Sequence, residues 1–228
     1  LIEIYNKFER CVMRKLMLAV GGSLILVAPL SQADIVGLGA SVSYWDSDLS
    51  GQAANSGDVV DVENDLNLDS DSDANANASL YLEHPVPLLP NVRLNYTVIE
   101  QSGRGRLGTS GFVGIPGSVE VQSDFDLDQL DLTLYYEVLD NWVNLDLGIT
   151  ARDLSGELVV QDTNGLFSPS ETKVDGVIPM GYLAARFDLP LTGVSVGAEG
   201  NFISFDGDSL HDFNAYGQYE ISLIQLRA

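Results

Sequence analysis

The residues best suited to bind an ion in this sequence form an alternating run of acidic and amide side chains between positions 65 and 73. Carboxylate and carbonyl oxygens are the ligands that Ca²⁺ and Mg²⁺ prefer. A calcium loop between two helices also needs a central glycine and a distal glutamate at fixed positions, and the run has neither. The pattern indicates weak Ca²⁺ or Mg²⁺ binding, with a solvated acidic loop as the simpler interpretation. The candidate ligands are Asp65, Asn67, Asp69, Asp71 and Asp73.

Two histidines are the candidates for general acid–base work. His84 precedes a proline in a turn-like segment, and His211 lies in an acidic stretch, residues 206–212. An Asp–His pair can activate water or a serine hydroxyl. Closeness in sequence does not establish that geometry, so we expect a surface histidine and no catalysis. A hydrolase site at a rim formed by residues 206–212 is the alternative.

The charge balance excludes one class of partner. The chain has 33 acidic and 11 basic residues, a formal net charge of −22. Such a polyanion is repelled by nucleic acid. The glycines of "GRGRLG" lie in no strand–helix context, so this segment is not a nucleotide site. We expect Arg104 and Arg106 to meet either anionic lipid headgroups or the acidic segment before them.

A stretch near the N-terminus has the features of an export signal. Residues 13–33 begin with a basic pair, Arg14 and Lys15, and continue into an apolar run over 16–30. Small residues precede a cleavage position after Ala33, as in a secretory signal peptide. An uncleaved anchor is the alternative, although the apolar run is short for a spanning helix.

The signal peptide divides the chain into three parts. We expect residues 1–12 to be an upstream leader outside the protein, residues 13–33 to be removed, and residues 34–228 to form one domain. The single cysteine, Cys11, lies in the first part. The exported domain would therefore contain no disulfide to stabilise it.

The remaining chain alternates between apolar and polar residues with a period of two. Such alternation is typical of β-strands with two different faces. A proline-rich turn, "HPVPLLP", separates two of the runs, and the phase of another run changes at Gln129, which predicts a β-bulge there. The predicted strands cover residues 35–45, 73–83, 91–101, 124–138, 143–154, a segment ending at Phe187, 194–202 and 211–220.

Strand length and loop length favour a membrane barrel. Several runs reach about ten residues, as a tilted strand needs to cross a bilayer, whereas soluble strands have about five or six. Short connections alternate with long polar ones over 46–72, 102–122 and 155–172, a pattern typical of outer-membrane barrels. We therefore predict an all-β, antiparallel up-and-down transmembrane β-barrel with eight complete strands and the start of a ninth. A soluble periplasmic barrel or sandwich carrier, with the apolar face inside, is the alternative.

In such a barrel the polar faces would line a narrow lumen. Buried charges must pair, so we expect an ion network that fills the lumen. We also expect aromatic residues near the strand ends to form girdles at the two interfaces. The expected network residues are Arg93, Asp131, Glu137, Asp146, Arg152, Arg186 and Glu199, and the expected girdle residues are Tyr44, Trp45, Tyr136, Trp142 and Phe187.

Three segments carry a resemblance to a known family: "ADIVGLGASVSYWDSDLSG", "LYLEHPVPLLPNVRLNYT" and "DLTLYYEVLDNWVNLDLGI". In this order they resemble the small, largely uncharacterised outer-membrane β-barrel proteins of Gram-negative proteobacteria. The resemblance implies a barrel of about eight to ten strands with no established ligand. Such barrels end in an aromatic residue read by the barrel insertion machinery, whereas this chain ends in "LIQLRA". We therefore expect a natural chain of ten strands that is truncated here; a complete eight-stranded barrel is the alternative.

These patterns predict a non-enzymatic protein of the bacterial outer membrane with a structural or surface-interaction role. Its expected partners are outer-membrane lipid, lipopolysaccharide and the insertion machinery, and its acidic segment would share Ca²⁺ or Mg²⁺ with lipopolysaccharide phosphates. A narrow passive pore for small solutes is the alternative function. No cofactor other than such a weakly bound ion is expected.

Overall fold

The computed structural model describes residues 23–27, 36–45, 50–68, 71–72, 75–86, 88–205, 208–221 and 224–228. In this part of the chain, no helix is long and apolar enough to cross a membrane. The strands are β1 (Ser23–Val27), β2 (Gly37–Trp45), β3 (Gln52–Asn55), β4 (Asp58–Asp61), β5 (Asp71–Ser72), β6 (Asn75–Glu83), β7 (Asn91–Arg106), β8 (Glu120–Asp140), β9 (Val143–Asp162), β10 (Ser170–Leu189), β11 (Val194–Phe205), β12 (Asp208–Ile221) and β13 (Ile224–Arg227).

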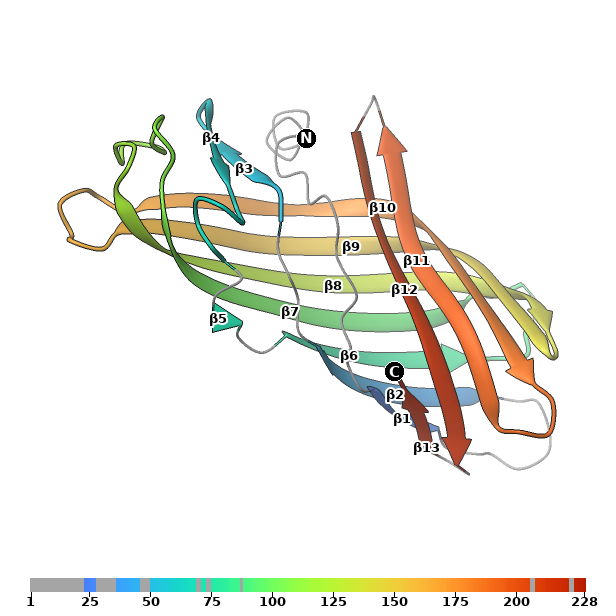
Figure 1. The fold of residues 1–228 in the computed structure, drawn as a ribbon. Helices are drawn as coiled ribbons and strands as arrows, with labels where there is room; N and C mark the ends of the chain where they lie inside the picture. Colours follow the sequence, from blue (N-terminus) through green and yellow to red (C-terminus); the bar gives the residue numbers. More distant parts are fainter. Residues whose placement is uncertain are drawn as a thin grey trace.

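All of these strands except β3 and β4 form one curled antiparallel sheet (Figure 1), and β3 and β4 pair with each other in a separate hairpin. From β6 to β13, each strand pairs with the next one along the chain. The predicted all-β, antiparallel up-and-down architecture is therefore confirmed. β1 pairs with both β2 and β13, so the pairings run around a complete ring. This part of the ring is bonded over a short length, because β1 has five residues and β13 has four.

β1 comes from the predicted signal peptide, where no strand was expected. Its residues pair with Gly39–Ser43 of β2 and with Ile224–Arg227 of β13. Cleavage after Ala33 stays a prediction, and it would remove this strand from the ring.

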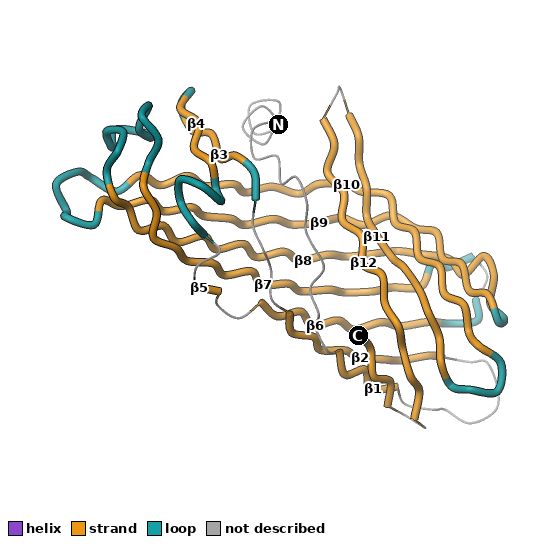
Figure 2. The backbone as a smooth tube through the Cα atoms, in the orientation of Figure 1, coloured by secondary structure: helices purple, strands orange, loops and turns teal. Residues whose placement is uncertain are grey.

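The sheet has two unlike ends (Figure 2). We call the end with the short connections after β6, β8 and β10 the turn end. The loop end carries the connections over residues 107–119 and 163–169, and the β3–β4 hairpin lies on the same side.

The central strands are longer than the sequence predicts. β7, β8, β9 and β10 have 16, 21, 20 and 20 residues. The long connections predicted over 102–122 and 155–172 are present but shorter, because the strands continue into both segments and leave connections over 107–119 and 163–169. The predicted bulge at Gln129 is wrong: pairing with β9 is continuous there, and the register shifts between Glu137 and Leu139 instead.

What changes near Gln129 is the polarity of the two faces of β8. Towards the turn end, Leu130 and Leu132 are exposed outward, whereas Asp131 is buried inside. Towards the loop end, Asp126 is exposed outward and Val121 is fully buried inside. The side chains alternate between the two faces throughout β8. Near the turn end the outer face is apolar and the inner face polar, whereas near the loop end the outer face is polar and the inner face apolar.

The neighbouring strands invert at the same level. On β9, Ile149 faces outward and Arg152 inward near the turn end, whereas Val160 is buried inward near the loop end. On β10, the outward residues change from Asp175 to Val177. The register aligns the outward polar residues at this level, which we call the boundary row: Asp128, Ser155 and Asp175. We call the parts of the sheet on its two sides the turn-end half and the loop-end half.

The apolar inner face of the loop-end half packs against a cap, which we define as residues 50–68 and 107–119. The cap supplies Leu66 and Phe112, which are 0% and 2% exposed, and the strands supply Val121 and Val160. Close approach of backbones is required here, because a Cβ at Gly103 or Gly105 would overlap the main chain of residues 65–68. The principal core of the protein therefore lies at the loop end.

Candidate functional site

The polar interior of the turn-end half is the candidate site. Its charged side chains make contacts between neighbouring strands and also between strands that are not neighbours in the sheet, and the second kind cross the interior. Arg152 on β9 forms ion pairs with Asp131 on β8, at 2.7 Å, and with Asp212 on β12, at 2.6 Å. The Arg152 side chain is 8% exposed and that of Asp131 4%. A buried guanidinium needs such partners to offset its lost hydration.

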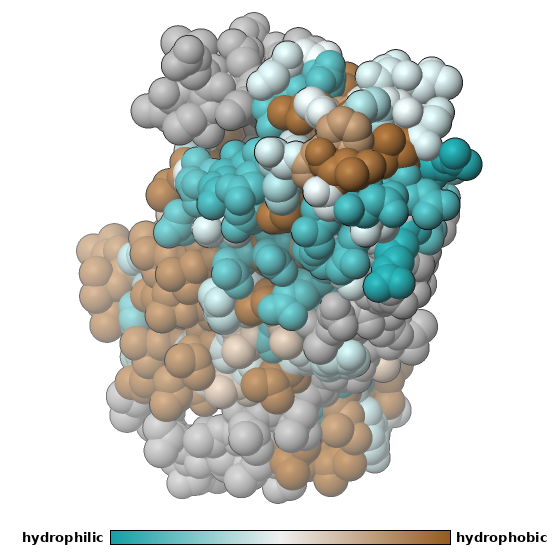
Figure 3. Space-filling model, turned by 90° about the vertical axis from the view of Figure 1, so that its left-hand side faces the viewer, coloured by the Kyte–Doolittle hydropathy of each residue, from teal (hydrophilic) through white to brown (hydrophobic). Residues whose placement is uncertain are grey.

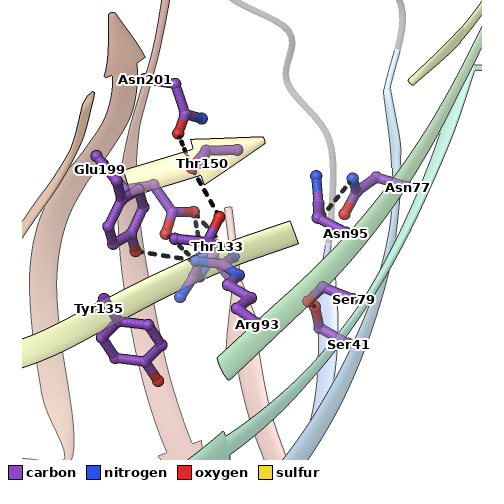
Figure 4. Close-up of polar contacts among 12 residues, drawn as sticks. Ser41, Asn77, Ser79, Arg93, Asn95, Thr133, Tyr135, Thr150, Glu199 and Asn201 are labelled. Carbon is purple, nitrogen blue, oxygen red and sulfur yellow. Dashed lines mark hydrogen bonds and ion pairs between the residues drawn. The ribbon is translucent and has the colours of Figure 1, made fainter. Parts of the chain in front are cut away.

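A second group of charges lies around Glu199 on β11 (Figure 4). Arg93 on β7 donates to Glu199 at 2.7 Å and to the Tyr182 hydroxyl at 3.2 Å. Arg227 on β13 forms an ion pair with the same carboxylate at 3.1 Å and lies over the Tyr216 ring. One acid therefore joins three strands across the interior.

Neutral polar side chains continue this network. Thr150 bonds the Thr133 hydroxyl at 2.8 Å and donates to Asn201 Oδ1 at 2.7 Å. On the other side of the view in Figure 4, the Ser41 and Ser79 hydroxyls bond at 2.6 Å. The inner face of the turn-end half therefore carries hydrogen bonds between neutral side chains as well as ion pairs.

Not every predicted network residue is paired as expected. Arg186 binds its own neighbour on the strand, Asp188, at 3.0 Å. Glu137 and Asp146 make no ion pair with a basic residue that the structure describes. They lie instead near Glu83, whose carboxylate accepts the Tyr135 hydroxyl at 2.9 Å.

Sequence reasoning missed Asp212, Arg227 and Asp188 as partners. Asp212 had been grouped with His211, and Arg227 belongs to a strand that was only begun. The period of two could have predicted the position of Asp212, because Asp212 lies on the same inner face of β12 as Tyr216 and Gln218.

Two of the predicted metal ligands, Asp65 and Asn67, lie in the cap and make hydrogen bonds within the protein. Leu66 and Leu68 are buried between the acidic and amide positions. Asp65 accepts the N–H of Asp61 at 3.0 Å, and Asn67 donates to the Arg104 carbonyl at 3.2 Å. The side chains of the other three candidates, Asp69, Asp71 and Asp73, lie outside the described residues. Among those described, no group of three or more His, Cys, Asp or Glu residues is arranged to hold a metal.

The two histidines occupy unlike places. His84 Nε2 lies 3.2 Å from the Pro90 carbonyl, and its Nδ1 accepts the Val86 N–H at 3.3 Å, so it ties the turn together. His211 is exposed on the outer face beside Phe213, whereas Asp212 faces inward to Arg152. The sequence-adjacent Asp–His pair is therefore not formed; Asp206 lies outside the described residues.

The two arginines of the predicted second loop and the described residues of the predicted aromatic girdle lie outside the interior network. Arg104 and Arg106 are exposed on β7, and neither makes an ion pair with any described residue, although Arg106 donates to the Ser118 carbonyl at 3.0 Å. Of the predicted girdle, Trp142 and Phe187 stack edge-to-face near the turn end, with ring centroids 5.4 Å apart. Tyr44 and Tyr136 are exposed outward, and the Trp45 side chain is outside the described part.

The site and fold define a class: an all-β antiparallel sheet curled into a barrel, with a polar interior and an apolar cap. Comparisons with protein-family models, with curated proteins and with solved structures find no match for this chain.

Proposed function

We propose that this protein is an integral β-barrel of the Gram-negative outer membrane that conducts no solute and has a structural or surface-interaction role. The observation that carries the proposal is the reversed polarity of the turn-end half, which faces outward with leucine, isoleucine, valine and tyrosine. An exposed apolar band of this size on a protein surface marks contact with lipid or with another protein.

The dimensions of the apolar band fit a bilayer. On β8 the outward apolar residues run from Leu130 to Val138, about nine residues, and a tilted strand crosses a membrane with about 9–11. The band surrounds the sheet, since Leu38, Leu80 and Phe213 are also exposed on other strands. In a hydrocarbon environment a curled sheet satisfies its backbone hydrogen bonds by pairing strand to strand.

The filled interior favours a barrel without a channel, not a pore. Ion pairs from Arg93 and Arg152 cross it in the turn-end half, and the cap core fills the loop-end half. A water-filled channel requires an unobstructed lumen. The sequence resemblance to outer-membrane barrels supports the same proposal, and lipid and lipopolysaccharide are the partners that it implies.

Two measurements on purified protein test the proposal. A folded barrel in unheated detergent should migrate differently on a gel from the boiled chain. In planar bilayers the folded protein should give no resolvable single-channel steps. A soluble carrier would be extracted without detergent and show no gel shift, whereas steady conductance would establish the narrow pore instead.

A further inference from the structure

We propose that the tip of the β9–β10 hairpin, residues 163–169, is a docking site for a basic protein surface that carries an apolar pocket. This inference rests on the proposed function, because it places the tip outside the membrane. It goes further by naming the contact residues and the chemistry of the partner.

The tip holds two hydrophobic side chains in solvent. Leu166 is 76% exposed and Phe167 36% exposed, and all of residues 163–169 are exposed. The face in Figure 3 shows hydrophilic residues around a compact hydrophobic area, with the brown residues of the apolar band more distant. β9 extends ten residues beyond Arg152 to reach the tip, about 33 Å along the strand. The tip is therefore accessible to another macromolecule.

The turn that presents Leu166 is rigid. Asp162 is 5% exposed, and its carboxylate accepts the N–H groups of Asn164 at 3.0 Å and Leu166 at 2.7 Å. Gly165 adopts φ = 66° and donates to the Asp162 carbonyl at 3.1 Å. The Thr163 N–H and hydroxyl both bond the Glu120 carbonyl, which ties the tip to β8. A pre-organised hydrophobic anchor loses little conformational entropy on binding.

The charge around the tip identifies the partner. The outer face of the loop-end half carries many acids, and neighbouring carboxylates add to desolvation in raising the pKa of Asp126. Acids outnumber the three cations of this outer face. Lys173 is already engaged by Glu157 at 3.0 Å and lies 3.8 Å from Glu171. Arg104 and Arg106 on β7 are exposed and make no ion pair with a described residue. Complementary charge speeds encounter and disfavours like-charged partners. A basic surface therefore fits, whereas a second copy of this chain or an anionic lipid surface would be repelled.

The test uses the full chain folded in zwitterionic lipid nanodiscs, with empty nanodiscs as the blank. Two twelve-residue probe peptides are compared: one alternates lysine with leucine, and the other alternates lysine with serine. Leu166 and Phe167 are changed together to serine. We expect the lysine–leucine peptide to bind the unaltered protein about tenfold more tightly than the double variant, from the apolar area that burial of Leu166 and Phe167 removes from water.

The matched control is Leu191→Ser, since Leu191 is a fully exposed leucine in a turn at the opposite end. This variant should bind the peptide like the unaltered protein. Equal binding of both peptides, or no loss in the double variant, would overturn the inference, as would tip-dependent dimerisation in sedimentation. Gel mobility of the same samples shows whether the barrel is folded. Loss of peptide binding with a normal gel shift therefore concerns the tip alone, whereas absence of the gel shift contradicts the proposed function.

Discussion

The two halves of β8 share one backbone, one register and one alternation, yet they present opposite faces to the outside. In the turn-end half Leu130 faces outward and Asp131 inward. In the loop-end half Asp126 faces outward and Val121 packs under the cap. The comparison teaches that a period of two defines a strand but does not say which face meets apolar surroundings. That depends on what lies on each side: a cap core inside one half, a polar network inside the other.

The largest effect should come from the polar interior. Arg152→Met leaves Asp131, whose side chain is 4% exposed, buried without its cation, and it also removes the ion pair to the partly exposed Asp212. Breaking such a pair costs about 3–5 kcal/mol, so the free energy of unfolding in urea should fall by about that amount. Lys173→Met is the control, because its ion pairs are exposed and screened by solvent, so almost no loss is expected. Similar small losses in both variants would contradict the view that the turn-end half depends on buried charge.

The apolar core of the loop-end half should respond differently. Leu66→Ala creates a cavity in the cap and should destabilise it by about 2–5 kcal/mol. We expect faster amide exchange in residues 53–68, with unchanged exchange in the turn-end half. Val59→Ala is the control, since Val59 is exposed on the same hairpin. Equal loss of protection in both halves would show that they unfold as one unit.

Exchanging outward residues tests the membrane placement directly. Arginine in place of Leu132 would lie in hydrocarbon, at a cost of about 2–4 kcal/mol, and should reduce the folded fraction in lipid vesicles. Asp126→Arg, beyond the boundary row on the same strand, should fold as well as the unaltered chain. If the outward face around Leu132 met water instead of hydrocarbon, both changes would be tolerated equally, and the proposed membrane placement would be wrong.

A smaller effect is expected in the cap. Val113 has φ = 39° between buried Phe112 and Ile115, a conformation that costs a β-branched residue about 1–2 kcal/mol. Asparagine adopts it more readily. Val113 and Val119 both pack against the cap core, but only Val113 has a positive φ. Val119→Asn loses packing alone, whereas in Val113→Asn the relieved backbone offsets the same loss. We therefore expect amide exchange in the cap to be slower in Val113→Asn than in Val119→Asn; equal exchange would contradict the strain at Val113.

The smallest effect is local and depends on pH. Backbone N–H groups of Asn164 and Leu166 lower the pKa of Asp162 below its usual range. Since the folded pKa is lower than the unfolded one, the stabilisation is present at neutral pH and is lost as pH falls below about 4. Amide protection at Asn164 and Leu166 should decrease in that range. In Asp162→Asn this pH dependence should disappear; its persistence would assign the effect to another group.

The sequence predicted the eight long strands because each contains a run with period two. It also identified Arg93, Arg152 and Glu199, since a charged residue in an otherwise consistent polar face must meet others inside a closed sheet. The continuation of β7 to β10 beyond the boundary row was missed. Beyond that row the outward residues, such as Asp126, are polar and resemble those of a loop. The inner face is apolar because the cap packs against it, and no local sequence pattern predicts that contact. β1 was missed because its apolar residues match an export signal as well as a strand.

The boundary row has a consequence for how the proposed barrel would respond to its bilayer. Sliding the sheet by two residues moves it about 7 Å along the strand direction. Towards the turn end this would pull Asp128 and Asp175 into hydrocarbon, and in the other direction it would lift Leu130 and Val177 into water. The boundary row would therefore fix the depth at which the barrel sits in the membrane. A bilayer thicker or thinner than the apolar band would have to deform around the protein.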